Sequence, residues 1–237
     1  MRCSELAMVR GVVLCLAVVV TSPVVWAANA ASKLLVGIPS GLPGYEAMDG
    51  NQLKISDPYK RGMTECISAR LNATFVWIAN PTKRIIQSLH ANELDLIYPM
   101  GFTEERADAL QQSEATWQNP DALVSLHLID MGNKSIHLAA RLGSPQQTDY
   151  VSDGYQNMTA AYAYEDLARL LARRAVDAVI VPRSVYNEQR TLWPAGAVLT
   201  LAKPRRSGFY LNRSDPKRLL KPLNDSIAQC RKTVQAN

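Results

Sequence analysis

Helix-starting prolines are the sequence feature that most constrains the fold of this chain. Proline suits the first position of a helix, where its missing N–H would have no partner, and a preceding Asp, Asn or Ser can cap the free N–H groups. This pairing occurs three times, at Asp57-Pro58, Asn80-Pro81 and Ser214-Asp215-Pro216. The first two predicted helices alternate with predicted strands at 33–39, 73–78 and 94–98. Strands and helices in alternation at short spacing predict a parallel sheet and an α/β fold.

The alternation starts again after Pro120, which predicts a second α/β unit. Gly143-Ser144-Pro145 is expected to form a turn, and Lys203-Pro204-Arg205-Arg206 a solvated crossover loop. A closing helix is expected to return to the first unit. We therefore expect one lobe of residues 31–122 and 208–237 and a second lobe of residues 123–207. In the second half, strands are predicted at 122–129, 136–140, 176–181 and 197–201, and helices at 165–174 and 184–190. The segment 209–211 leads into the closing helix.

Residues 1–30 have the pattern of an export signal. Arg2 and Arg10 precede and flank an apolar stretch at 11–20, which is too short to be a clear membrane span, and small residues follow at 28–30. We expect cleavage after Ala30, with Ala27 as the alternative; an uncleaved anchor is the other interpretation. No later apolar stretch reaches the roughly 18 residues of a spanning helix. The sequence therefore predicts an exported, periplasmic protein.

The net charge of +5 would ordinarily suggest nucleic acid as a partner. Export makes nucleic acid a poor partner, and we expect none. The mild basicity fits attraction for an anionic ligand, or solubility alone.

Two cysteines, Cys66 and Cys230, would remain after the signal is removed. Each lies on the apolar stripe of a predicted helix, and an oxidising compartment allows a disulfide between them. The alternative is two buried free thiols.

Signatures of catalysis and of metal binding are absent from the sequence. There is no G-x-S-x-G, no phosphate-binding glycine loop, no H-E-x-x-H and no C-x-x-C, and the three histidines lack metal-ligand spacing. We therefore expect a protein that is not an enzyme, with no catalytic residues, no cofactor and no metal.

The segment 80–106 resembles the bacterial extracellular solute-binding proteins of family 3, the periplasmic receptors of polar amino-acid uptake. A helix is followed by Glu93-Leu94-Asp95, a strand, a small-residue turn and Thr103-Glu104-Glu105-Arg106, which matches the T-x-x-R of that family. Val36-Gly37 and the segment 167–180 resemble further family motifs. The resemblance spans nearly all of the chain after the signal.

The resemblance implies a type II periplasmic binding fold, with two lobes that are each a mainly parallel sheet flanked by helices, joined by two crossover strands. It also implies that Arg106 binds the carboxylate of a ligand, a role that suits a planar, permanently charged guanidinium. An arginine on the surface paired with Glu104 or Glu105 is the alternative. The other candidate ligand-binding residues are Ser40, Tyr45, Tyr98, Gly101, Thr103, Ser144 and Arg183, and Trp117 could add an aromatic wall.

One departure from the family changes the expected ligand. Family members place an Asp after the strand at 176–181 to bind the ligand's ammonium, whereas Pro182 and Arg183 follow it here. An anionic or neutral organic solute therefore becomes the better candidate.

The sequence thus predicts an exported, monomeric solute-binding protein that clamps a small polar or anionic organic solute, amino-acid-like or a carboxylate, between two lobes. The expected partner is a membrane transporter permease. The alternatives are an enzyme on the same scaffold, of the dehydratase kind, and an orphan ligand-sensing module. The identity of the solute cannot be read from the sequence.

Overall fold

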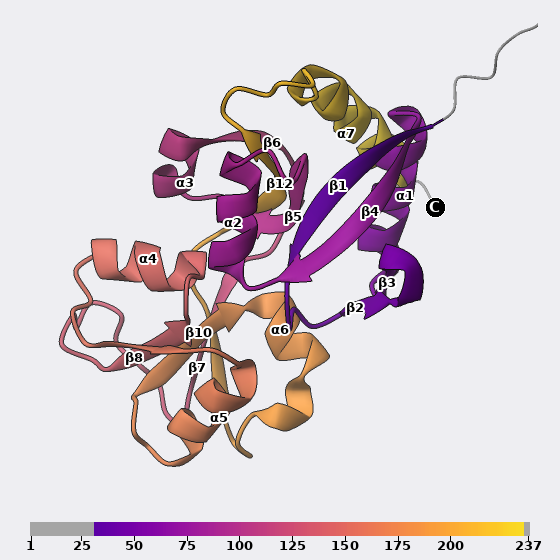
Figure 1. Cartoon of the computed structure of the whole chain (residues 1–237). Coiled ribbons are helices and arrows are strands. Elements are labelled where there is room, and N and C mark those ends of the chain that lie inside the picture. Colours follow the sequence, from indigo (N-terminus) through magenta and orange to yellow (C-terminus); the bar gives the residue numbers. More distant parts are fainter. Residues whose placement is uncertain (1–30, 235–237) are drawn as a thin grey trace, which may run out of the picture. The chain divides into compact units, whose positions relative to one another are not determined.

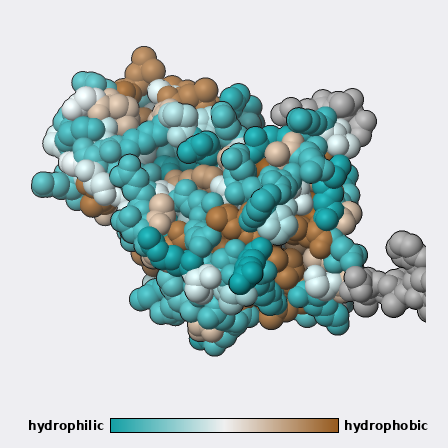
Figure 2. Space-filling view, turned by 90° about the horizontal axis from the view of Figure 1, so that it is seen from above, coloured by the Kyte–Doolittle hydropathy of each residue, from teal (hydrophilic) through white to brown (hydrophobic). Residues whose placement is uncertain are grey.

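The computed structural model describes residues 31–234 (Figure 1). The expected export signal and its cleavage site lie outside the described residues. Within residues 31–234, no helix is both long and apolar enough to cross a membrane. Hydrophilic side chains cover most of the face shown in Figure 2, and hydrophobic side chains form patches between them.

The first sheet has five strands in the order β4-β1-β5-β12-β6. β1 pairs in parallel with β4 and β5, whereas β12 pairs antiparallel with β5 and β6. Four strands therefore run in one direction and β12 runs against them. The strands are β1 (Ser32–Pro39), β4 (Ala73–Asn80), β5 (Leu96–Gly101), β6 (Leu110–Gln118) and β12 (Arg206–Asn212).

Helices cover both faces of this sheet (Figure 1). Side chains that alternate along β12 point to opposite faces, so that Phe209 packs with α1 and α7, and Tyr210 packs with α2. Burial on both faces explains why β1 and β5, in the middle of the sheet, are nearly continuous runs of apolar residues. The other elements of this lobe are α1 (Pro58–Arg70), α2 (Thr82–His90), α3 (Glu104–Ala109), α7 (Leu220–Val234), the hairpin β2 (Tyr45–Met48) and β3 (Gln52–Ile55), and a short 3₁₀ turn (Asp49–Asn51).

The second sheet has the order β11-β7-β10-β8-β9 and repeats the same design. β8 pairs in parallel with β9 and β10, and β7 runs antiparallel to β10 and β11. α5 and α6 pack on one face, and Tyr150 of α4 packs on the other. The elements are β7 (Asp121–Ser125), β8 (Leu138–Arg141), α4 (Pro145–Ser152), β9 (Met158–Ala161), α5 (Tyr164–Ala172), β10 (Ala178–Pro182), α6 (Arg183–Glu188), a 3₁₀ turn (Arg190–Leu192) and β11 (Val198–Leu201).

Two connections join the sheets, one from β6 to β7 and the other from β11 to β12. They run side by side, because the backbone N–H of Asn119 donates to Arg205 O and that of Asp121 donates to Lys203 O, each at 2.8 Å. The predicted fold class is confirmed: two α/β lobes with mainly parallel sheets, joined by two crossover segments.

Three helices begin at residues other than those expected from the sequence. α2 begins at Thr82, with Pro81 at the cap and no side-chain cap bond, because Asn80 is the last residue of β4. α7 begins at Leu220, although the Asp215 carboxylate still accepts from the N–H of Leu219 at 2.8 Å and of Leu220 at 2.9 Å. Pro145, expected in a turn, opens α4.

A disulfide joins Cys66 of α1 to Cys230 of α7. Both helices pack against the same core beneath the first sheet (Figure 1). The bond therefore connects the closing helix to the first lobe, across 164 residues of sequence.

Candidate functional site

A cavity of about 90 Å³ lies between the two sheets. Four of its lining residues, Pro39, Gly101, Arg141 and Pro182, are the last residues of β1, β5, β8 and β10. Ligands of open α/β sheets bind outside the carboxyl ends of parallel strands, and here such ends from both lobes meet. The cavity is also lined, among others, by Leu42, Tyr45, Lys60, Arg106, Trp117, Asn119, Leu142, Gly143, Ser144, Tyr164, Ser184 and Arg205.

Arg106 lies in α3 and is 8% exposed. Its Nη1 donates to Gly101 O of its own lobe at 2.9 Å, and its Nη2 donates to Gly143 O of the second lobe, also at 2.9 Å. Thr103 caps α3, because its hydroxyl oxygen accepts from the Arg106 N–H at 3.2 Å. Burial lowers the pKa of Arg106, but a guanidinium stays charged. The described residues therefore hold a buried cation that pairs with backbone carbonyls and with no carboxylate.

Lys60 is a second buried cation of the cavity and is only 3% exposed. Its Nζ lies 4.1 Å from the ring centre of Trp117 and 5.5 Å from that of Tyr45. Glu188 of the second lobe is its counterion, at 3.3 Å. Sequence reasoning missed Lys60, although its spacing to Met63 and Ile67 places it on the buried face of α1.

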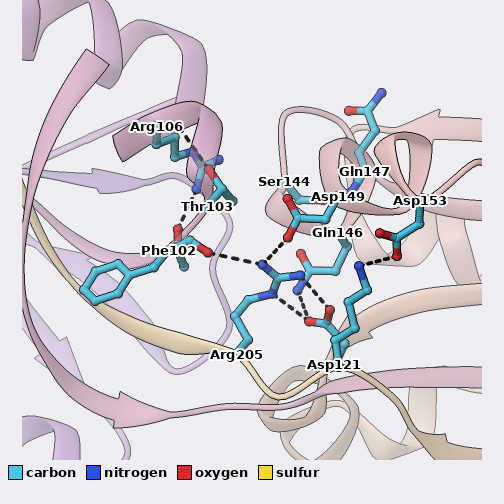
Figure 3. A network of polar contacts seen from close by, with 12 residues as sticks. Phe102, Thr103, Arg106, Asp121, Ser144, Gln146, Gln147, Asp149, Asp153 and Arg205 are labelled. Atoms are coloured by element: carbon cyan, nitrogen blue, oxygen red, sulfur yellow. Dashed lines mark hydrogen bonds and ion pairs between the residues drawn. The ribbon is translucent and has the colours of Figure 1, made fainter. Parts of the chain in front are cut away.

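Arg205 is the centre of a polar network at the two connections (Figure 3). It binds Asp121 through Nε at 2.9 Å and Nη2 at 2.7 Å, and Nη1 binds Asp149 at 2.8 Å. Gln146 donates to the same Asp121 carboxylate at 2.7 Å. Burial alone would lower the pKa of Arg205, but hydrogen bonds to Asp121 raise it above its ordinary value.

The expectation of a solvated loop at 203–206 is therefore wrong for Arg205, which is 7% exposed. Asp121 lies at the start of β7 and Arg205 precedes β12, so the ion pair joins the two connections to one another. Arg206 is exposed, as expected for such a loop.

Four of the candidate ligand-binding residues line the cavity, namely Tyr45, Gly101, Arg106 and Ser144. Trp117, which was expected to add an aromatic wall, also lines the cavity. Its buried indole N–H has no hydrogen-bond partner among the described residues.

The other four candidates lie elsewhere. Ser40 lines a neighbouring pocket, and its carbonyl accepts from Arg141; Thr103 acts as the cap of α3. Tyr98 is fully buried and stacks on Phe209 with ring centres 4.3 Å apart, because β5 turns this side chain into the core. Arg183 begins α6 with an exposed side chain and is not among the lining residues.

Within residues 31–234, no group of three or more His, Cys, Asp and Glu side chains is arranged to hold a metal ion.

No family model matches the sequence, and no curated protein matches it. Solved structures do share the fold. An ABC uptake transporter substrate-binding protein from Streptococcus pneumoniae, with bound histidine, is 14% identical with a TM-score of 0.70, over 85% of this chain and 87% of that one.

Two further solved structures share the fold. A histidine kinase sensor domain with similarity to periplasmic binding proteins is 16% identical, with a TM-score of 0.71 over 87% of this chain and 93% of that one. An ancestral amino-acid-binding protein, a precursor of cyclohexadienyl dehydratase, is 15% identical, with a TM-score of 0.68 over 85% of this chain and 90% of that one.

The chain therefore has the two-lobed fold of periplasmic binding proteins, as the resemblance of its sequence predicts. At these identities the likeness shows the fold, and the function has to be argued from the cavity.

Proposed function

We propose that this chain is an exported solute-binding protein that holds a small polar or anionic organic solute, amino-acid-like or a carboxylate, between its lobes. In this proposal it delivers the solute to a membrane transporter. The observation that carries the proposal is Arg106, a buried cation at the cavity without a carboxylate partner among the described residues.

A buried cation without a counterion is unfavourable, because its hydration is lost and no opposite charge replaces it. Two of the five guanidinium N–H groups of Arg106 donate to carbonyls, which leaves three for a ligand. A ligand carboxylate would supply the missing charge and accept two parallel hydrogen bonds. The free indole N–H of Trp117 is a further donor at the same cavity.

Contacts between the lobes support a mechanism of hinge closure. Arg106 donates to Gly143 O across the cleft, and Lys60 pairs with Glu188 across it. A ligand that contacts both lobes stabilises the closed state by its differential affinity for that state. The lobe boundaries proposed here are 31–122 with 208–237, and 123–207. Residues 1–30 are proposed as the cleaved signal that directs the chain to the periplasm, and the partner is the permease.

The test begins with mass spectrometry of small molecules that co-purify with the protein, followed by calorimetry with the solute found. Arg106→Ala should weaken binding by about 2–5 kcal/mol, roughly 30-fold or more, because the anionic group of the ligand is left buried and unpaired. Arg106→Lys should recover only part of this, because an ammonium cannot form the paired hydrogen bonds.

The matched control is Arg173→Ala, which removes an exposed arginine at the end of α5. Circular dichroism confirms that each variant folds. Equal affinities of Arg106→Ala and the control would refute the assigned role of Arg106.

A second candidate function is ligand sensing, because a sensor domain shares the fold at a TM-score of 0.71. Uptake of the solute by cells that lack this chain distinguishes the two functions, since only a transport receptor is required for uptake. An enzyme is less well supported, because the described residues that line this cavity include no Asp, Glu or His to act as acid or base; His90, Glu105 and Glu165 line a separate, neighbouring pocket.

A further inference from the structure

The charges that line the cavity all have the same sign. Lys60, Arg106, Arg141 and Arg205 are lining residues, and no Asp or Glu in the described part of the chain lines the cavity. Two of the four cations are neutralised within the protein, Arg205 by Asp121 and Asp149, and Lys60 by Glu188. Arg106 and Arg141 form no ion pair with any described residue. The cavity therefore presents two positive charges that lack counterions.

These two arginines come from opposite lobes and reach across the cleft in opposite directions. Arg106 of the first lobe donates to Gly143 O of the second, and Arg141 of the second lobe donates to Ser40 O of the first. Arg141 also donates through Nε to Tyr162 O at 3.3 Å. A carbonyl dipole orients a guanidinium but carries no net charge, and both arginines keep further N–H groups for a ligand. Two anionic groups on one ligand would neutralise both cations.

The aromatic faces at the cavity are already occupied by an ammonium group. Lys60 Nζ lies 4.1 Å from the ring centre of Trp117, beside Tyr45, and Glu188 balances its charge. Indole and phenol faces attract cations, and these faces would otherwise be available to a ligand's amino group. A ligand ammonium at this cavity would meet Lys60 and two arginines, and no described Asp or Glu lines the cavity to pair with it. Like-charge repulsion and desolvation both disfavour it.

We propose that the solute is a dicarboxylate without an amino group, with one carboxylate bound by Arg106 and the other by Arg141. In this arrangement Lys60 takes the place that a ligand's amino group would occupy. The proposal rests on the proposed function and makes it more specific, from a small polar or anionic solute to an aliphatic dianion.

The direct test is calorimetry of the purified protein with probes that differ by single groups. Succinate and L-aspartate have the same carbon chain and differ by the amino group, and glutarate and L-glutamate form a second such pair. Butyrate has only one carboxylate. The better dicarboxylate should bind at least tenfold more tightly than its amino-acid counterpart and at least 30-fold more tightly than butyrate. An amino acid that binds as tightly as its matched dicarboxylate, or tighter, would overturn the proposal.

Two variants test the assigned roles. Arg141→Gln should weaken dicarboxylate binding at least 30-fold, whereas Arg173→Gln, which also removes one positive charge but from an exposed position, should change it less than threefold. Lys60→Met retains the apolar stem and frees the aromatic faces, so the affinity ratio should move at least tenfold toward the amino acid. Lys54→Met, at an exposed lysine, is the matched control and should leave the ratio unchanged. An unchanged affinity in Arg141→Gln, or an unchanged ratio in Lys60→Met, would each refute the corresponding role.

The two proposals can fail separately. If none of the five probes binds, the dicarboxylate proposal is refuted. The search for a co-purified solute, and its dependence on Arg106, still decides whether the protein is a solute receptor.

Discussion

Replacing Arg205 by methionine should destabilise the folded protein strongly. Arg205 forms three of its hydrogen bonds with Asp121 and Asp149, and the Asp121 side chain is completely buried. Methionine fills much of the same volume but leaves the Asp121 carboxylate with only the Gln146 amide as a side-chain donor among residues 31–234. The variant thus retains a buried charge without a counterion.

The magnitude follows from the burial of the two carboxylates. Removing one partner of a buried ion pair costs about 3–5 kcal/mol. Asp149 adds little to this, because its side chain is 26% exposed and can return to water. For a domain of this size, 1 kcal/mol corresponds to roughly 2–4 °C in Tm, so we expect Tm to fall by about 6–20 °C.

Urea denaturation followed by circular dichroism measures the change. Arg206→Met is the matched control, because Arg206 is the exposed neighbour and its loss should change the free energy of unfolding by less than about 0.5 kcal/mol. The double variant Arg205→Met with Asp121→Leu should recover stability relative to Arg205→Met, since no unpaired charge remains. A loss below about 1 kcal/mol in Arg205→Met, or no recovery in the double variant, would refute this reasoning.

Three other perturbations have defined outcomes. Reducing the Cys66–Cys230 disulfide, which spans 164 residues, should lower the free energy of unfolding by up to about 5 kcal/mol. Urea denaturation with and without reductant measures this, and equal unfolding midpoints would contradict it. Gly208→Ala places a Cβ 2.8 Å from a backbone oxygen and should lower the free energy of unfolding by about 1–3 kcal/mol in the same assay. Gly62→Ala in α1 should raise the free energy of unfolding by about 0.5–1 kcal/mol. A Gly208→Ala variant that is more stable than the Gly62→Ala variant would contradict both expectations. Alkaline pH should destabilise the protein, because burial raises the pKa of Tyr98 to about 12. The folded chain then keeps a proton that the unfolded chain has lost, so the free energy of unfolding falls between about pH 10 and 12, by up to roughly 1.4 kcal/mol per pH unit for each such tyrosine. A flat profile over pH 9–11 in stability measurements would contradict this. Burial also raises the pKa of Tyr45, Tyr150, Tyr164 and Tyr210.

Much of the fold was predictable from the sequence, because its signals are local. The strands predicted at 33–39 and 73–78 correspond to β1 and β4, since runs of apolar residues bounded by turn residues require no knowledge of the rest of the chain. β6 was not predicted, because it has no such local signal. Its sequence, LQQSEATWQ, is largely polar, and it is a strand because β12 returns to pair with it from nearly 100 residues further on.

The site was less predictable than the fold, because its charged residues depend on partners that are distant in sequence. Arg205 and Asp121 lie 84 residues apart, and Lys60 and Glu188 lie 128 residues apart. A single charged residue in a sequence is most reasonably assigned to solvent. Among the charged residues that line the cavity, Arg106 alone was predicted from the sequence, because a motif identified it.

The side-by-side connections also determine how this protein can be rebuilt. Asp121 N donates to Lys203 O, and Ala202 N donates to Asp121 O, both at 2.8 Å, so the segment between them begins and ends at one hydrogen-bonded pair. A segment whose two ends already meet can be exchanged with no additional loop to close. Residues 122–202 are therefore a natural cassette: a reporter domain, or a second lobe of different specificity, could be grafted at these two points while β12 and the disulfide-linked closing helix keep the first lobe intact.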